Sequence, residues 1–129
     1  MARQRVIVHY TRIYTDSDGE SHFEDVNAQL AEADFAPPAP PLAVSSFLAA
    51  TQFGFVAAPS GWYGDWHPTP RRQVFFVLSG QLEATVSDGE VRRLRAGDVL
   101  LVEDTAGKGH VSRTIGAADV ITAVVQLPD

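Results

Sequence analysis

The chain has 129 residues, 45% of them hydrophobic, and a formal net charge of −6. This length suits one compact domain with a single core. Nine of the ten basic residues are Arg and only Lys108 is a lysine, so we expect neither a nucleic-acid nor a membrane partner. Cysteine is absent, which excludes disulfides and thiolate chemistry. The apolar run before His9 is too short for a signal peptide, so a cytoplasmic protein is expected.

Short apolar runs separated by turn-forming residues predict an all-β chain. The expected strands are, in chain order, 6–14, 44–57, 73–78, 81–86, 91–94, 99–102, 110–114 and 120–127. The pairs Ser79-Gly80 and Asp88-Gly89 lie between consecutive runs and are typical of tight hairpin turns, which need positive φ angles. We therefore expect a meander of antiparallel strands.

The N-terminal third is expected to form an arm outside the main barrel. A turn at 16–19 follows the first strand, and residues 27–34 are expected to form a brief helical turn. Residues 36–41 contain four prolines, which lack the amide donor of a sheet ladder. We interpret them as an extended connector, so that one domain over 1–129 comprises an arm (1–35), this connector and a barrel core (42–129).

Some of the expected strands are apolar on both faces. In 73–78, Phe75 and Val77 point one way, and three apolar residues point the other way, namely Val74, Phe76 and Leu78. The facing sheet covers the inner set, but the outer set needs a loop, an arm or a second subunit. We therefore predict a homodimer joined through a sheet face.

Two strings carry a resemblance to a known family. DWHPTPRRQ and the residues after it give the spacing His67-x-Thr69-x3-Gln73-x6-Gly80, and GDVLLVEDTAGKGH ends at His110. They resemble the two motifs of the cupin family, written G-x5-H-x-H-x3,4-E-x6-G and G-x5-P-x-G-x2-H-x3-N. Thr69 and Gln73 then stand where cupins have their second His and their Glu.

The second motif is also altered, because Glu103, Thr105 and Lys108 take the places of its Pro, Gly and His. We interpret His110 as the motif His, delivered by a slightly longer loop. With the string GESHFED near the start, the likeness to small bacterial cupins covers nearly the whole chain. It implies an all-β, cupin-type jelly-roll barrel or sandwich with an N-terminal β arm, but no particular reaction, since the family spans several chemistries.

Strand alternation predicts a pocket inside this barrel. If 65–78 runs extended, six residues share one face, namely His67, Thr69, Arg71, Gln73, Phe75 and Val77. His110, Ser112 and Thr114 likewise share a face, which the resemblance turns inward. We expect the two rows to converge on a small organic molecule, with Trp66 as a further pocket wall.

A divalent metal ion is one candidate cofactor. Cupins typically hold such an ion with three His and one Glu, so the resemblance offers His67, Gln73 and His110, with His22 or Asp65 completing the site. The amide oxygen of Gln73 carries no charge to offset the ion, which predicts weak binding.

The interpretation without metal is proton transfer by the histidines. His110 is the expected base or acid, His67 its counterpart, and Arg71 or Lys108 the group that stabilises negative charge. Glu103 and Asp104 precede the glycine-rich loop, and either orients a His or satisfies turn amides.

We favour a small-molecule enzyme with non-oxidative chemistry, of isomerase, cyclase or lyase type, acting on an organic acid, polyketide-like or sugar-like substrate. Two alternatives stay open: a metal-dependent cupin oxygenase and a non-catalytic ligand-binding cupin.

Overall fold

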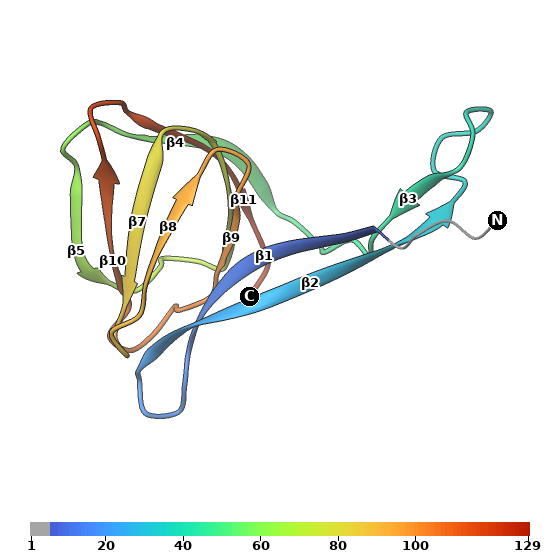
Figure 1. The fold of residues 1–129 in the computed structure, drawn as a ribbon. Helices are drawn as coiled ribbons and strands as arrows, with labels where there is room; N and C mark the ends of the chain where they lie inside the picture. Colours follow the sequence, from blue (N-terminus) through green and yellow to red (C-terminus); the bar gives the residue numbers. More distant parts are fainter. Residues whose placement is uncertain (1–5) are drawn as a thin grey trace.

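The computed structural model describes residues 6–129 and contains no helix within them, so the all-β prediction is confirmed (Figure 1). Among these residues nothing resembles a helix that could cross a membrane. The strands are β1 (Val6–Thr15), β2 (Ser21–Ala33), β3 (Leu42–Val44), β4 (Gln52–Ala58), β5 (Tyr63–His67), β6 (Gln73–Ser79), β7 (Gln81–Val86), β8 (Val91–Arg95), β9 (Val99–Val102), β10 (His110–Ile115) and β11 (Val120–Gln126).

The strands form two sheets that pack face to face (Figure 1). The larger has seven strands in the order β3-β2-β1-β9-β6-β11-β4, and the smaller has four in the order β5-β10-β7-β8. All neighbours run antiparallel except β1 and β9, which pair in parallel. The hairpin predicted at Asp88-Gly89 is present as β7–β8. The hairpin predicted at Ser79-Gly80 is wrong: the turn is there, and both glycines have positive φ, but it joins β6 to β7 in the other sheet.

Both sheets contribute to a single buried core. Its members are Ile13, Phe23, Val77, Ala84, Val86, Leu94, Leu100, Val102 and Val120. Ile13 has no exposed surface and lies opposite Val102 in the parallel β1–β9 pairing. The base of the N-terminal hairpin is therefore part of the barrel wall, and only its outer half projects as an arm (Figure 1).

The helical turn expected at 27–34 is wrong, because residues 21–33 form one long strand. Strand β2 pairs with β1 from Ser21 to Leu30, so every second residue along this stretch directs its backbone N–H and C=O groups at β1. Val26, Ala28 and Leu30 alternate with more exposed neighbours, which is a period of two rather than 3.6. That alternation favoured a strand over a helix in the sequence itself.

The connector prediction is also corrected. Strand β3 pairs antiparallel with β2, so the proline-rich residues reverse the chain at the tip of the arm instead of extending it to the barrel. The single strand expected at 44–57 is instead β3, an irregular segment over 45–51, and β4. Strand β5 was not anticipated, because it is short and its Gly64-Asp65 pair resembles a turn.

We predict that Ile13→Ala destabilises the protein by about 2–5 kcal/mol, the usual cost of truncating a buried Ile. Ile7→Ala on the same strand is the matched control, because Ile7 is 43% exposed, and it should change stability by less than about 0.5 kcal/mol. Urea unfolding of both variants measures the difference. Equal effects would mean that the hairpin is not part of the core.

Candidate functional site

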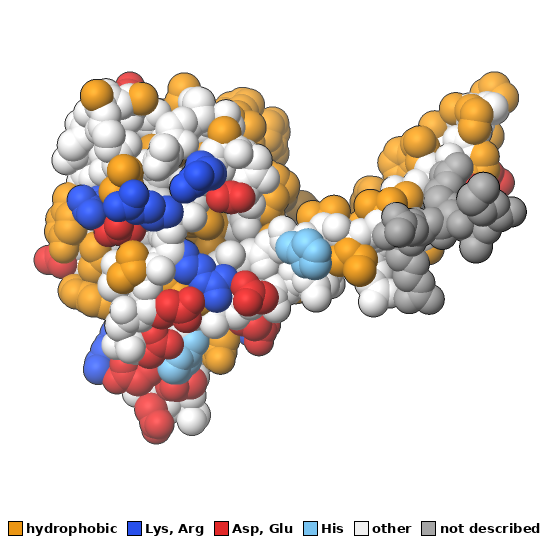
Figure 2. Space-filling view, viewed as in Figure 1, with side chains coloured by type: hydrophobic (Ala, Val, Ile, Leu, Met, Phe, Trp, Pro, Cys, Tyr) orange, Lys and Arg blue, Asp and Glu red, His pale blue; other side chains and the backbone are white. Residues whose placement is uncertain are grey.

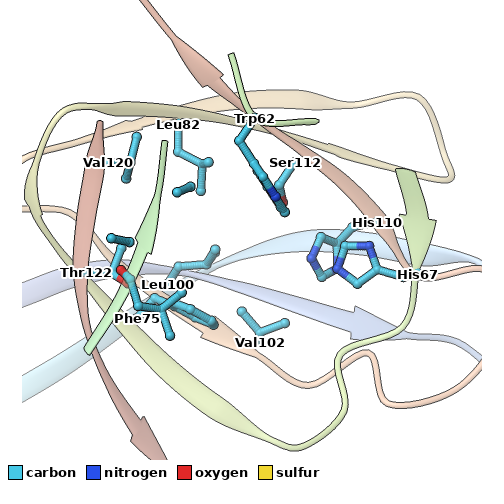
Figure 3. A pocket seen from close by; sticks show the side chains of 13 residues that line it. Trp62, His67, Phe75, Leu82, Leu100, Val102, His110, Ser112, Val120 and Thr122 are labelled. Carbon is cyan, nitrogen blue, oxygen red and sulfur yellow. The ribbon is translucent and has the colours of Figure 1, made fainter. Parts of the chain in front are cut away.

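A cavity of about 230 Å³ lies between the two sheets (Figure 3). Its wall is mostly apolar and is drawn from both layers: Val56, Ala57, Ala58, Trp62, Phe75, Leu82, Leu100, Val102 and Val120. Four polar residues complete it, namely His67, His110, Ser112 and Thr122. A concave, mostly apolar space with a few polar groups is the usual form of a small-molecule site.

The two histidines lie side by side because their strands are neighbours. His67 on β5 and His110 on β10 are directly opposite each other in the antiparallel pairing. Residues opposite one another on adjacent strands project from the same face of the sheet, so both rings face the cavity. The ring centroids are 4.8 Å apart with an angle of 54° between the planes (Figure 3). The predicted convergence of the two rings is therefore present in the structure.

Asp104 fixes the orientation of His110. Its Oδ2 lies 2.6 Å from His110 Nδ1, and the carboxyl group has no exposed surface. As a carboxylate, Asp104 accepts a hydrogen bond from Nδ1–H, which leaves Nε2 as the atom that can take or give a proton. Its second oxygen, Oδ1, is buried without a hydrogen-bond partner among residues 6–129, so His110 is the carboxylate's side-chain partner there.

His67 is held in the same tautomer by a different acceptor. Its Nδ1 is 2.5 Å from the carbonyl oxygen of Asp65, and a carbonyl can only accept, so Nδ1 carries the proton. Nε2 of His67 is again the atom left for chemistry. The pair therefore offers two Nε2 atoms to a molecule in the cavity, one backed by a buried carboxylate and the other by a neutral carbonyl.

The loop that carries Asp104 is anchored by Glu103. Its carboxylate binds Arg12 Nε at 2.5 Å and Arg72 Nε at 2.6 Å, and its amide donates to Ile13 O. Burial works to raise the pKa of Glu103, but the hydrogen bonds from the two arginines outweigh it and leave that pKa below its ordinary value. Of the two acidic residues that the sequence analysis singled out here, Asp104 orients the histidine and Glu103 holds the loop.

Phe75 and Ser112 line the cavity as predicted. Ser112 is buried, and its hydroxyl group makes no hydrogen bond to another residue of the described part of the chain. Thr122 is different, because its hydroxyl already donates to Val56 O at 2.8 Å. Ser112 is thus a polar group within the cavity that is free to bind a ligand.

Thr69 and Gln73 are buried but are not among the residues that line the cavity. Gln73 Nε2 donates to Thr69 Oγ1 at 3.1 Å, and Thr69 in turn donates to Arg71 O. Gln73 Oε1 accepts from Gln126 at 3.3 Å. Their polar groups bind one another, so the structure gives them a part in holding the turn between β5 and β6.

Arg71 and Lys108 are not brought to the cavity either. Residues 68–72 belong to no strand, so the alternation that would have turned Arg71 inward stops at His67, and its side chain is exposed. Lys108 is 61% exposed and pairs with Glu20 on the outside of the barrel. The residues lining the cavity include no cation to stabilise negative charge.

Trp62, rather than Trp66, forms the aromatic wall. Trp66 is next to His67 in β5, so it points to the opposite face and is 48% exposed. The ring of Trp62 lies over Gly64, where an added Cβ would come within 2.4 Å of the indole. The signal in the sequence was this glycine two residues after the tryptophan, which leaves space for the ring to fold inward.

The residues present do not fit a tightly held metal ion. Among residues 6–129, no group of three His, Asp or Glu side chains is placed to share one ion. The amide of Gln73 is occupied by Thr69 and Gln126, and His22 binds Asp16 and Asp88 at the surface. Two imidazoles alone fall short of the three or four protein ligands usual for a transition metal.

The fold and the site together define a small two-sheet β-barrel with a pocket between its sheets. A cupin domain model matches residues 54–124, more than half of the chain, and the protein belongs to the cupin family with its jelly-roll fold. No curated protein matches the chain.

Two solved structures show the same fold. The cupin domain of Cnp3 from Schizosaccharomyces pombe superposes with a TM-score of 0.51 at 18% identity, over 94% of this chain and 88% of that one. A Cupin 2 conserved barrel domain protein from Salinispora arenicola gives 0.50 at 17% identity, over 78% and 76%. Identities this low extend to the fold and not to the reaction.

We predict that Gly109→Ala displaces His67. Gly109 has φ of 72°, and an added Cβ would lie 2.1 Å from the carbonyl carbon and oxygen of His67. Gly89→Ala is the matched control, because Gly89 has φ of 98° with open space around it, so it carries the backbone strain without the clash. Imidazole NMR signals of His67 and His110 should shift in Gly109→Ala alone. Unshifted signals would mean that this glycine does not set the position of His67.

His22 generates a prediction about pH. Its hydrogen bond to Asp16, helped by the one to Asp88, raises its pKa above the ordinary 6.5. A pKa raised by folding stabilises the protein below the unfolded value, and this contribution is lost as pH rises through the folded value. The stability lost in His22→Gln should therefore be largest near pH ~5.5, where both aspartates are charged, and should shrink above pH ~7. Urea unfolding across this range measures it, and a loss independent of pH would contradict the assignment.

Proposed function

We propose that this cupin binds a small, mostly apolar organic molecule in the cavity between its sheets and moves a proton on it, without redox chemistry. The observation that carries the proposal is the pair His67 and His110, side by side at an apolar cavity, with His110 backed by the buried carboxylate of Asp104. Isomerisation, cyclisation and elimination all need a base and an acid placed near one another, and two adjacent imidazoles can supply both.

His110 is the general base in this proposal. Its Nε2 takes the proton from carbon while Asp104, bonded to Nδ1, holds the ring and offsets the positive charge that forms on it. Because Asp104 has no exposed surface, this interaction is not weakened by water. Asp104 does not touch the substrate and is a positioning residue.

His67 is the general acid in this proposal: protonated on both ring nitrogens, it gives the Nε2 proton to the developing oxygen or nitrogen anion, and transfer of a proton from His110 to His67 restores both rings. The Nδ1–H of His67 bonds a neutral carbonyl, whereas Nδ1 of His110 bonds a buried carboxylate that offsets positive charge on that ring. The free hydroxyl of Ser112 can donate a further hydrogen bond to the same substrate atom. The acceptor bonded to each Nδ1, a carboxylate for His110 and a carbonyl for His67, thereby assigns the base and the acid.

The cavity wall supports an uncharged substrate. Its lining holds no Lys or Arg, so a carboxylate or phosphate entering it would lose hydration without gaining an ion pair. Trp62 and Phe75 offer flat apolar surfaces to a ring or a conjugated chain. A small ketone, enone or aromatic compound suits this lining better than the organic acid or sugar that the sequence suggested.

The test uses 5-nitrobenzisoxazole, a flat uncharged probe. A base removes its ring C–H proton, the electron pair forms the nitrile as the N–O bond breaks, and the phenolate product is followed by absorbance. We expect His110→Gln to lower the protein-dependent rate by about 10²-fold and Asp104→Asn by about tenfold or more, because the first removes the base and the second its orienting partner.

His22→Gln is the control, because it removes a histidine with two carboxylate partners that lies away from the cavity. Its rate should equal that of the wild type. Quenching of tryptophan fluorescence reports whether the probe binds. Binding with equal rates in the wild type and in His110→Gln would reject proton transfer and favour a ligand-binding protein. Stoichiometric iron, manganese, nickel or copper in protein purified without chelator would favour the oxygenase alternative.

A further inference from the structure

The wall of the cavity carries two hydrogen-bond donors that have no partner among residues 6–129. The first is the hydroxyl group of Ser112 on β10, a residue that is 8% exposed and lines the cavity. The second is the indole Nε1–H of Trp62, which makes no hydrogen bond to another described residue. An indole N–H can only donate, and a hydroxyl group has one hydrogen to donate. Both groups are therefore available to an acceptor atom of a ligand.

The two donors lie next to each other because of the pairing between β5 and β10. Ser112 is opposite Gly64 in this pairing, so the two residues share one face of the sheet. Gly64 has no side chain, and the indole of Trp62 fills its place: an added Cβ would lie 2.4 Å from Cη2 and 2.9 Å from Cζ2 of the ring. Cζ2 is two bonds from Nε1, so the N–H group lies at the same part of the wall as Ser112 (Figure 3).

Backbone hydrogen bonds hold Trp62 in this position. Its amide donates to Pro59 O at 3.0 Å, which closes the turn between β4 and β5. Its carbonyl oxygen accepts from the amide of Thr114 at 3.0 Å, two residues after Ser112 on β10. The same strand therefore positions both donors before a ligand arrives, and donors placed in advance stabilise a developing charge without reorganisation.

The histidine pair lies one repeat of the strand away from these donors. His110 precedes Ser112 by two residues on β10, which separates their Cα atoms by about 6.5 Å. Both side chains line the same cavity. A small molecule there can present a C–H group to His110 Nε2 and an oxygen atom to the two donors at the same time.

The arginines and the lysine of the barrel lie outside the cavity. Arg93 and Arg113 bind Glu83 on the outer face of the smaller sheet, and Figure 2 shows Lys and Arg side chains on the surface of the barrel. No Asp or Glu lines the cavity either, so a negative oxygen atom meets no like charge on the wall. Apart from a protonated imidazole, neutral donors are what the lining offers to such an atom.

We propose that Trp62 Nε1–H and Ser112 Oγ–H form an oxyanion site, and that the substrate is a carbonyl compound with a C–H group next to its carbonyl. This role rests on the proposed function, since the charge forms only when His110 removes the proton. The C–H electron pair then forms the C=C bond of an enolate, and the carbonyl π pair moves to the oxygen that the two donors hold. His67 gives its Nε2 proton to the enolate, which completes the transfer. Trp62 and Ser112 contact the reacting oxygen and are catalytic residues.

The test compares two ligands that differ by one oxygen atom. Pentafluorophenolate resembles an enolate because it is flat and carries negative charge on oxygen, whereas pentafluorobenzene measures the packing of the ring alone. Fluorine NMR titration gives both affinities at pH ~9, where an ordinary histidine is uncharged. We expect Ser112→Ala and Trp62→Phe each to lower the ratio of phenolate to benzene affinity by about tenfold, the usual loss of a hydrogen bond to a charged atom. Binding of pentafluorobenzene shows that the cavity of each variant is intact.

Each variant has a matched control. Thr122→Val also removes a hydroxyl group from the cavity lining, but this hydroxyl already donates to Val56 O. Trp66→Phe makes the tryptophan exchange at a residue that is 48% exposed on the opposite face of β5. Both controls should keep the affinity ratio of the wild type.

An unchanged ratio in Ser112→Ala or in Trp62→Phe overturns the oxyanion site, as does a wild type that does not bind pentafluorophenolate. Binding of this probe involves no proton transfer, so the result is independent of the base. Equal 5-nitrobenzisoxazole rates in the wild type and in His110→Gln would reject the proposed function even where the affinity ratio falls as expected. A rate that depends on His110 with an unchanged affinity ratio would reject the oxyanion site alone.

Discussion

Both surfaces of the seven-stranded sheet carry apolar side chains, and the other features of this protein depend on that constraint. On the inner surface, Phe75, Leu100 and Val120 face the smaller sheet and leave between the layers a cavity with an apolar wall. The outer surface holds Phe76, Leu101 and their neighbours. A sheet of this kind cannot be stable as a free layer in water, because burial of apolar area is what offsets the loss of chain entropy on folding. The smaller sheet covers the inner side.

The fold could be predicted from the sequence wherever strands were regular and turns had strong signals. The turns at Gly80 and Gly89 and the strands around them are as expected, since positive φ at glycine and alternating side chains are local properties. That the turn at Gly80 leads into the other sheet was not predicted, because it depends on partners distant in the sequence. Strand β2 was missed because alternation between small apolar and polar residues gives a weak signal when one face is only half-buried. The reversal at the proline-rich tip was missed because the pairing of β3 with β2 is set by partners distant in the sequence.

The same difference between local properties and long-range contacts explains which residues of the site could be predicted. His67, Phe75, His110 and Ser112 lie at the cavity as alternation predicted, since each lies within a strand. Arg71 and Thr69 do not, because residues 68–72 leave the sheet and alternation has no meaning there. The role of Asp104 depends on which loop residue contacts the ring of His110, six positions later. The sequence alone allowed Glu103 this role as well. The two arginines that bind Glu103 decide between them, and they come from distant segments.

Phe75 and Phe76 are adjacent on β6 and point to opposite sides of the sheet, one into the cavity and the other outward. A single layer of backbone therefore separates the interior compartment from the outer surface, and close-packed protein transmits a shift on one side of such a layer to the other. A molecule large enough to push β6 aside would also move Phe76 and the outer face of the sheet. In this barrel, one strand therefore links the shape of the cavity to the shape of the outer face.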